Sequence, residues 1–172
     1  MQHGARVALL LVATVLCYAW GLDSPLLFDD LPNLGALAFI DNAPVFNAGF
    51  REFVLGGDSG PTGRPVALFT FALQAAAWPD HPLAFKAVNL FIHCVNAILV
   101  YGISARLLGL LRADDRDAGN VALCIALVWA LHPVHTATVL YAVQRMALLS
   151  NGFMLAGVYA WLILQGLAIL FA

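Results

Sequence analysis

The chain has few charged side chains and few cysteines. Of its 172 residues only 10% are Asp, Glu, Lys or Arg, and the formal net charge at pH 7 is -2. The eight Lys and Arg residues are scattered, so no basic patch is present to neutralise a run of phosphates, which argues against a nucleic-acid partner. The three cysteines, Cys17, Cys94 and Cys124, lie inside apolar runs without metal-ligand spacing. We therefore expect buried free thiols rather than disulfides or a zinc site.

Hydrophobic residues, by contrast, are abundant. They make up 62% of the chain, and the mean hydropathy is +0.87. This composition is far from the balance of a soluble domain and predicts an integral membrane protein. We expect an all-α fold in which apolar runs of about 20 residues cross the bilayer as helices.

Four apolar runs are candidates for membrane spans, over about 7–22, 83–108, 119–131 and 146–171. Together they form a single membrane domain, 1–172, with a long first loop over 23–82. The third run is short for a span because Pro133 and two histidines end it early. The first run, which Arg6 precedes, is also compatible with a signal peptide, because Ala19 and Gly21 fit a small-x-small cleavage site.

The distribution of basic residues predicts the orientation. The connection between the second and third spans carries Arg106, Arg112 and Arg116, whereas the long first loop has only two arginines against seven acidic residues. Because Lys and Arg are enriched in cytoplasmic loops, we expect both termini to be cytoplasmic and the long loop to lie outside. The expected location is a bacterial inner membrane, with the active face periplasmic. Short helices along the membrane surface are expected within the loop, over about Leu31–Phe39, Pro44–Leu55 and Pro65–Trp78.

Two adjacent carboxylates, Asp29 and Asp30, follow the first span. A carboxylate near an outer membrane face is well placed to act as a general base toward a hydroxyl acceptor. The alternative is a structural role, in which the pair marks a solvated helix end or Asp30 caps a helix that begins at Leu31 and Pro32.

Two histidines, His132 and His135, flank Pro133 near the end of the third run. Three interpretations are open for them. They could bind a divalent metal together with Asp29 or Asp30, hydrogen-bond a phosphate or an acceptor, or pack at the membrane interface.

Two arginines, Arg64 and Arg145, each have two possible roles. Arg145 lies at the start of the fourth span, and Arg64 precedes Pro65 in the first loop. Either side chain can extend to the lipid headgroups or hold a phosphate by a bidentate contact. With the predicted orientation, Arg145 falls on the outer face together with the carboxylates and the histidines. Such a set suits catalysis on an anionic lipid substrate.

The second span carries polar residues along one side of a helix. These are Lys86, Asn89, His93 and Asn96, at offsets of three, seven and ten. Because polar groups in lipid are costly, this side must face protein or water. The stripe therefore either makes hydrogen bonds between helices or forms the wall of a wet cavity.

Five motifs occur in an order that resembles that of a known family. They are Phe28-Asp29-Asp30, Arg64-Pro65, Val88-Asn89-Leu90-Phe91-Ile92-His93 followed by Asn96-Ala97, Leu131-His132-Pro133-Val134-His135, and Tyr141-Ala142-Val143-Gln144-Arg145. The set resembles the N-terminal membrane region of the GT-C superfamily of glycosyltransferases, in particular the transmembrane-and-tetratricopeptide mannosyltransferases and their bacterial relatives. The resemblance covers nearly the whole chain.

The resemblance implies an α-helical membrane enzyme that transfers a sugar from a polyprenyl-phosphate carrier to an acceptor hydroxyl. The catalytic carboxylate of the first outer loop would correspond to Asp29 or Asp30. The substrate and its phosphate would be bound by a cationic and imidazole set: Arg64, His93, His132, His135 and Arg145. No cofactor is indicated with certainty, and a divalent metal is an alternative.

Size is the departure from the family pattern. Members have many more spans and often helical repeats, whereas this sequence stops at Ala172, directly after its fourth predicted span. We therefore expect either a fragment of a longer enzyme or a chain whose lipid-phosphate groove is completed by a partner subunit. The alternative is a non-catalytic scaffold subunit of a larger membrane complex that is derived from the same fold.

Overall fold

The computed structural model describes residues 2–40, 48–56, 64–111 and 115–170. Every regular element within these ranges is a helix, which confirms the all-α prediction. The long helices are α1 (Gln2–Ala19), α5 (Pro82–Leu110), α6 (Asp115–Ala130) and α8 (Arg145–Leu170). The short elements are α2 (Asp30–Leu34), η1 (Gly35–Phe39), α3 (Ala48–Leu55), α4 (Pro65–Ala72), η2 (Ala75–Ala77), α7 (His135–Leu140) and η3 (Ala142–Gln144), where η marks a 3-10 helix.

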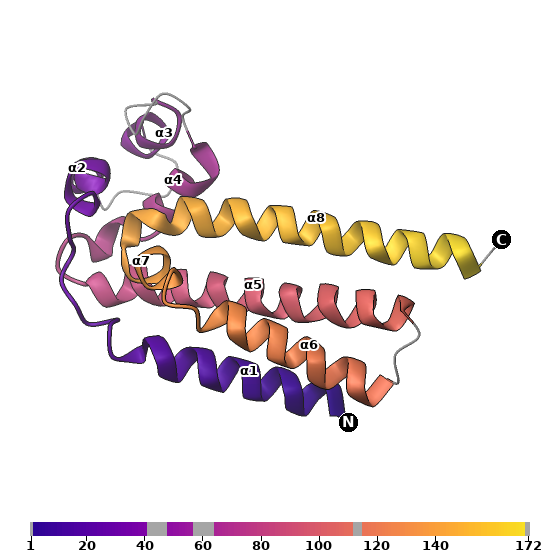
Figure 1. The fold of residues 1–172 in the computed structure, drawn as a ribbon. Coiled ribbons are helices and arrows are strands. Elements are labelled where there is room, and N and C mark those ends of the chain that lie inside the picture. The colour runs from indigo at the N-terminus through magenta and orange to yellow at the C-terminus, as the bar shows by residue number, and fades with distance from the viewer. Residues whose placement is uncertain (1, 41–47, 57–63, 112–114, 171–172) are drawn as a thin grey trace.

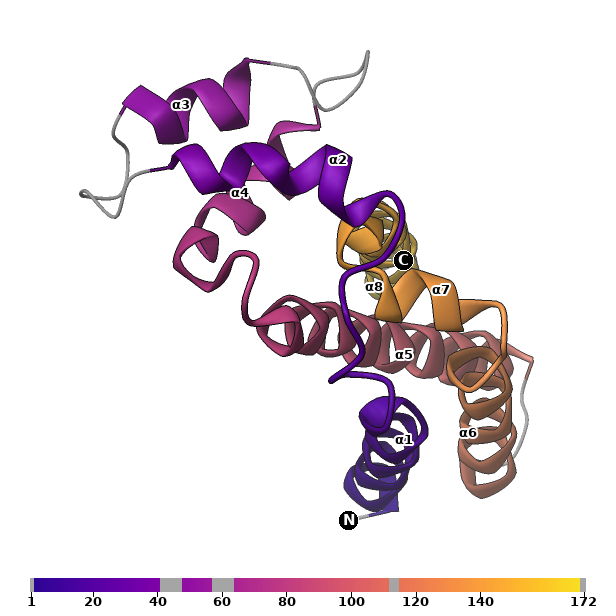
Figure 2. The same cartoon turned by 90° about the vertical axis from the view of Figure 1, so that its left-hand side faces the viewer.

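The long helices lie side by side, and α5 packs against α1, α6 and α8 (Figures 1 and 2). By length and composition, three segments of the described chain can cross a membrane: α1, α5 and the segment Ala142–Gly166, which contains most of α8. α6 has 16 residues, fewer than the roughly 20 that a bilayer core needs, so the fourth span stays a prediction. α1 begins and ends earlier than the predicted range 7–22.

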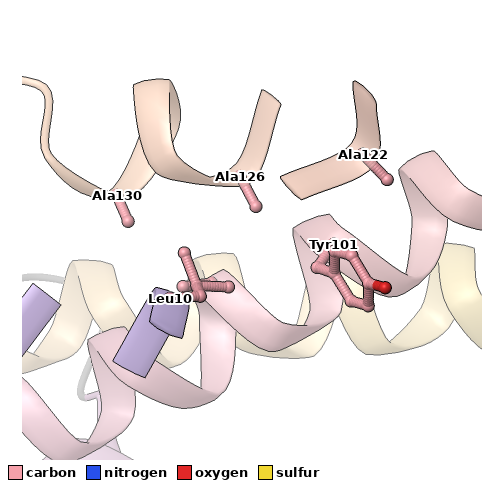
Figure 3. Packing of buried hydrophobic residues seen from close by; sticks show 6 residues of the cluster. Leu10, Tyr101, Ala122, Ala126 and Ala130 are labelled. Atoms are coloured by element: carbon pink, nitrogen blue, oxygen red, sulfur yellow. The ribbon is translucent and has the colours of Figure 1, made fainter. Parts of the chain in front are cut away.

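Small residues on α6 allow it to lie close to α1 and α5. Ala122, Ala126 and Ala130 are spaced at one helical turn and are fully buried. Figure 3 shows these alanines with Leu10 of α1 and Tyr101 of α5, with which they form one buried cluster. In lipid, where no hydrophobic force drives helices together, close packing of small residues stabilises such an interface.

The connections between the long helices gather at two opposite ends of the bundle. Figure 1 shows the start of α1, the end of α5, the start of α6 and the end of α8 at one end, and α2, α3, α4 and α7 at the other. The helices expected in the first loop correspond in sequence to α2 with η1, to α3, and to α4 with η2, while 44–47 lies outside the described residues. Their position along a membrane surface stays a prediction.

The helical structure is interrupted between Ala130 and Arg145. α6 ends shortly before Pro133, because proline lacks the N–H that would continue a helix and restricts the residue before it. α7 and η3 then lead the chain to the start of α8. Such an interruption leaves backbone carbonyl groups without partners in their own helix, and buried carbonyls must find donors elsewhere.

The polar stripe of α5 supplies donors to this interruption through Asn89 and His93, and to two other segments through Lys86 and Asn96. All four of its side chains are fully buried. Each donates to a backbone carbonyl of a different segment: Lys86 to Ser24 (2.5 Å), Asn89 to Tyr141 (2.8 Å), His93 through Nε2–H to Ala130 (2.9 Å) and Asn96 to Leu148 (3.0 Å). The hydrogen bonds bear out the first of the two interpretations, in which the stripe joins helices, and they fix the start of α8 against α5.

Candidate functional site

A polar pocket lies at the end of the bundle where the short helices gather. Its volume is about 460 Å³, and it is lined by Asp29, Asn33, Arg64, Val143, Gln144, Met146 and Ala147. These residues come from the start of α2, from the residue before α4, and from η3 and the first turn of α8. Two of the predicted site residues, Asp29 and Arg64, are thus brought to one pocket.

The two adjacent carboxylates have different environments. Asp29 is exposed, lines the pocket and makes no side-chain capping bond to α2. Asp30 is fully buried, and its two oxygens accept hydrogen bonds from the backbone N–H groups of Val143 (2.8 Å) and Leu27 (3.2 Å). The expectation that Asp30 caps a helix beginning at Leu31 is wrong, because Asp30 is itself the first residue of α2 and its carboxylate bonds amides outside that helix. Only Asp29 of the pair is therefore accessible to a bound molecule.

Arg64 is exposed, and its Nη1 donates to Sδ of Met146 at 2.8 Å. Its backbone has φ 36° and ψ 47°, a left-handed conformation that side chains with a Cβ rarely adopt. Phe28, directly before Asp29, has φ 43°, and these are the two non-glycine residues with positive φ in the described ranges. Strained backbone of this kind clusters at functional sites. Arg64 lines the pocket, and Phe28 directly precedes the pocket-lining Asp29.

Arg145 does not line the pocket. Its side chain is fully buried at the start of α8, so the expectation that it extends to the lipid headgroups is wrong. Nε donates to Oδ1 of Asn89 (3.0 Å), Nη1 to the carbonyl of Thr70 (3.1 Å) and Nη2 to the carbonyl of Phe85 (3.0 Å). Its Cζ also lies 4.2 Å from the ring centroid of Phe71. These contacts enclose the guanidinium between α4 and α5. Gln144, the residue before Arg145 in the sequence, does line the pocket.

The predicted histidines gather elsewhere, around Trp129. The ring of His93 stacks on Trp129 at 5.1 Å between centroids and lies 5.0 Å from the ring of His135. His132 is exposed, and its Nδ1 accepts a hydrogen bond from the N–H of Val134. His132 and His135 line a separate groove of about 710 Å³ along α6. Burial lowers the pKa of His135, and the nearby His132 is a smaller cause in the same direction.

The metal alternative lacks a ligand set in the described part of the chain. No group of three or more His, Cys, Asp or Glu side chains within those ranges is arranged to hold a metal ion. His132 and His135 line the groove along α6, whereas Asp29 lines the pocket beside α2. A divalent cation needs several such donors around one point.

Five pocket residues were not among the predicted site residues: Asn33, Val143, Gln144, Met146 and Ala147. Asn33 lies one helical turn after Asp29, and its Nδ2 donates to the backbone carbonyl of Asp29 at 2.7 Å. That spacing is the signal that could have identified it. Gln144 belongs to the same sequence motif as Arg145, which was the predicted site residue. Gln144 lines the pocket, whereas Arg145 does not.

Comparison with known proteins confirms the predicted resemblance. The chain is similar to Protein O-mannosyl-transferase F38B6.6 of Caenorhabditis elegans, with 27% identity over 161 residues that cover 90% of this chain and 23% of the relative. It is 28% identical over 157 residues to Protein O-mannosyl-transferase TMTC4 of Homo sapiens, covering 82% of this chain and 20% of the relative. It is 29% identical over 162 residues to Protein O-mannosyl-transferase TMTC1 of Homo sapiens, covering 87% of this chain and 17% of the relative. No family model and no solved structure matches the chain.

The chain spans about a fifth of the length of these relatives. All three are animal proteins, so they give no support to the expected bacterial inner membrane. The apolar helices support an integral membrane protein.

Proposed function

We propose that this chain is the membrane portion of a glycosyltransferase that moves a sugar from a polyprenyl-phosphate carrier to an acceptor hydroxyl. The observation that carries the proposal is the polar pocket, in which the exposed carboxylate of Asp29 and the exposed guanidinium of Arg64 share one space. The names of the relatives support mannose as the sugar and a protein hydroxyl as the acceptor. Membrane-spanning helices next to the pocket suit a substrate with a lipid tail.

In the proposed reaction, Asp29 acts as the general base. Its carboxylate takes the proton of the acceptor hydroxyl while the hydroxyl oxygen forms a bond to the anomeric carbon of the sugar. The bond between that carbon and the phosphate oxygen breaks, and the lipid phosphate leaves with the electron pair. Because a phosphate leaves readily without protonation, a single carboxylate suffices, unlike the pair of a glycosidase. Arg64 stabilises the charge of the leaving phosphate by a charge-assisted contact.

Asp30 and Arg145 act as positioning residues in this proposal. Asp30 holds the amide of Val143, and Arg145 holds the first turn of α8 against α4 and α5. Both segments contribute lining residues to the pocket. No step is assigned to the three histidines around Trp129.

We infer that the pocket faces the outer side of the membrane. It lies at the end of the bundle with the short helices, opposite the termini and the connection after Arg106 (Figure 1). Arginine-rich connections favour the cytoplasmic side. We further infer that a partner subunit or additional membrane helices complete the walls around the lipid carrier, since lipid-sized ligands are usually enclosed over most of their surface.

A second candidate function is a non-catalytic scaffold within a larger membrane complex. The observation in its favour is that Asp30 and Arg145, two residues of the motifs that resemble the glycosyltransferases, are fully buried and bonded internally. Stable association with another membrane complex, without binding of sugar lipids, is the result that this function predicts.

The test is sugar transfer by the full chain in vesicles that contain polyprenyl-phosphate mannose, with a Ser/Thr peptide as the acceptor. We expect transfer by the wild type and a loss of about 100-fold or more in Asp29→Asn, the low end of what general-base catalysis contributes. The matched control is Asp23→Asn, because Asp23 is an exposed aspartate of the same loop that does not line the pocket. Equal rates in Asp29→Asn and wild type would reject Asp29 as the base, and a wild type that shows neither transfer nor sugar-lipid binding would favour the scaffold.

A further inference from the structure

A second groove lies between the long helices, away from the Asp29 pocket. Its volume is about 600 Å³, and α1, α5 and α8 all contribute to its walls. Figure 2 shows α5 between α1 and α8. The groove includes His3, Tyr101, Arg106, Tyr159, Leu162 and Gly166. Its lining contains basic and aromatic side chains but no acidic one among the described residues.

The position of the groove along α5 corresponds to a membrane boundary. At about 1.5 Å per residue, Arg106 lies about 36 Å along α5 from its first residue, Pro82. A bilayer core is about 30 Å thick, so a guanidinium at this distance reaches the headgroups on the side opposite the short helices. Tyr101 lies about 8 Å closer to the bilayer centre along the same helix. Tyrosines near the boundary and an arginine at it form the pattern of a membrane interface.

Two glycines shape the floor of the groove. A Cβ added at Gly102 would lie 2.9 Å from Cε2 of Tyr159, so the ring of this α8 tyrosine rests against the α5 backbone. A Cβ added at Gly166 would lie 3.7 Å from Nη1 of Arg106, so the guanidinium extends along α8. Arg106 is exposed and makes no hydrogen bond or ion pair within the described ranges. Its guanidinium donors therefore remain available to a ligand from the bilayer.

A hydrogen-bonded pair forms the opposite wall. Nδ1 of His3 lies 2.7 Å from the hydroxyl of Tyr101, which joins the first turn of α1 to α5. The remaining lining is largely apolar and includes Leu110 and Leu162. A cation beside an apolar groove suits a ligand with an anionic head and hydrocarbon chains. A free anion would contact only the polar side chains of the groove.

We propose that this groove binds an anionic phospholipid of the cytoplasmic leaflet, with Arg106 on the lipid phosphate and the acyl chains extending past Leu162 toward the bilayer centre. Cytoplasmic leaflets carry anionic lipids, and basic pockets between membrane helices on that side bind their headgroups. The lipid joins α1, α5 and α8 at the end of the bundle opposite α2, α3, α4 and α7 (Figure 1). Its site is separate from the proposed sugar-transfer pocket.

The experiment measures the melting temperature of the full chain in detergent as single lipids are added. Phosphatidylglycerol is expected to raise the melting temperature in a saturable manner, because a ligand that binds only the folded state stabilises it. Phosphatidylcholine and inorganic phosphate are expected to give a much smaller shift. Arg106→Gln should weaken the apparent affinity for phosphatidylglycerol at least fivefold, and Arg106→Lys should restore most of it. Arg51→Gln, which removes an exposed arginine of α3 at the other end of the bundle, is the matched control and should bind like the wild type.

A second variant keeps the test decisive if Arg106→Gln lowers stability by itself. Gly166→Leu fills the groove beside Arg106 without removing the charge, and it should weaken phosphatidylglycerol binding as well. Three results would overturn the proposal: equal shifts with phosphatidylglycerol and phosphatidylcholine, an equal shift with phosphate alone, or unchanged binding in both Arg106→Gln and Gly166→Leu. An equal shift with phosphate would indicate a site for free anions instead.

Discussion

The backbone N–H of Val143 donates a hydrogen bond of 2.8 Å to Oδ1 of Asp30, joining residues that are 113 positions apart in the chain. This bond ties the start of α2 to the 3-10 turn that precedes α8. The neighbouring carboxylate of Asp29 stays exposed and lines the pocket that this junction forms. Adjacent residues of one motif thus have different environments, because Asp30 is bonded to the backbone whereas Asp29 is exposed to the pocket.

Replacing Arg64 by Gln should impair sugar transfer without unfolding the protein. The side chain is exposed, so its loss leaves no buried group unpaired, but the leaving phosphate loses a positively charged donor. We expect a decrease in kcat/KM for the polyprenyl-phosphate donor of about 100-fold, the size reported for single donors that stabilise developing charge. Transfer rates at a series of donor concentrations measure the effect. Arg51→Gln is the control, and an Arg64→Gln enzyme with the wild-type kcat/KM would exclude Arg64 from phosphate binding.

Removing Asn89 should destabilise the fold more than removing Asn96. The Asn89 side chain accepts a hydrogen bond from Nε of Arg145 (3.0 Å) and donates to three carbonyls: those of Val139, Tyr141 and Ala142. Asn96 donates to the carbonyl of Leu148 alone (3.0 Å). We expect Asn89→Ala to lower the free energy of unfolding by about 1–3 kcal/mol, and Asn96→Ala by about 0.6 kcal/mol.

Unfolding of the two asparagine variants in mixed micelles of increasing denaturing detergent provides this comparison. Equal losses for Asn89→Ala and Asn96→Ala would mean that the bonds of Asn89 to the interrupted segment contribute little.

His135 should make stability depend on pH. Burial lowers its pKa in the folded protein below the ordinary value of 6.5. The unfolded chain then binds a proton more readily than the folded protein, so the contribution of His135 is complete above about pH 6.5 and is lost as the pH falls through the folded pKa. His135→Gln should therefore show a smaller decrease of melting temperature between about pH 7.5 and pH 5 than the wild type. Parallel pH profiles of the two proteins would contradict the prediction.

The long helices are largely predictable from the sequence. The expected span 83–108 corresponds to α5 over Pro82–Leu110, and 146–171 to α8 over Arg145–Leu170, because apolar runs of bilayer length favour helices. The start of α1 is different. Arg6 was expected to precede the span, yet it is buried within α1, where Nε donates to Oδ1 of Asn120 on α6 at 3.1 Å. A tertiary partner of this kind leaves no local signal.

The candidate site is predictable only in part, for the same reason. Asp29 and Arg64 can be chosen from the motifs, since they are polar residues in a loop next to membrane helices. Arg145 has the same local pattern, but its carbonyl partners on Thr70 and Phe85 lie 75 and 60 positions away in the chain, so its burial cannot be read from its neighbours. His93 likewise meets Trp129 through the packing of α5 against α6, whereas His132 and His135 lie only three and six residues after Trp129 in the chain.

The most direct test of the proposed site measures sugar transfer and melting temperature in the same preparations of Asp29→Asn and Asp30→Asn. Asp29→Asn should lose transfer by about 100-fold or more while its melting temperature stays that of the wild type. Asp30→Asn replaces one accepting oxygen by an amide group, which leaves the buried N–H of Val143 or the partly buried N–H of Leu27 without its acceptor and should lower the free energy of unfolding by about 1–3 kcal/mol. Transfer per folded molecule should decrease much less in that variant than in Asp29→Asn, because Asp30 acts only by positioning Val143. Full transfer activity in Asp29→Asn, or loss of transfer in Asp30→Asn at unchanged stability, would contradict the assignment of Asp29 as the reacting carboxylate.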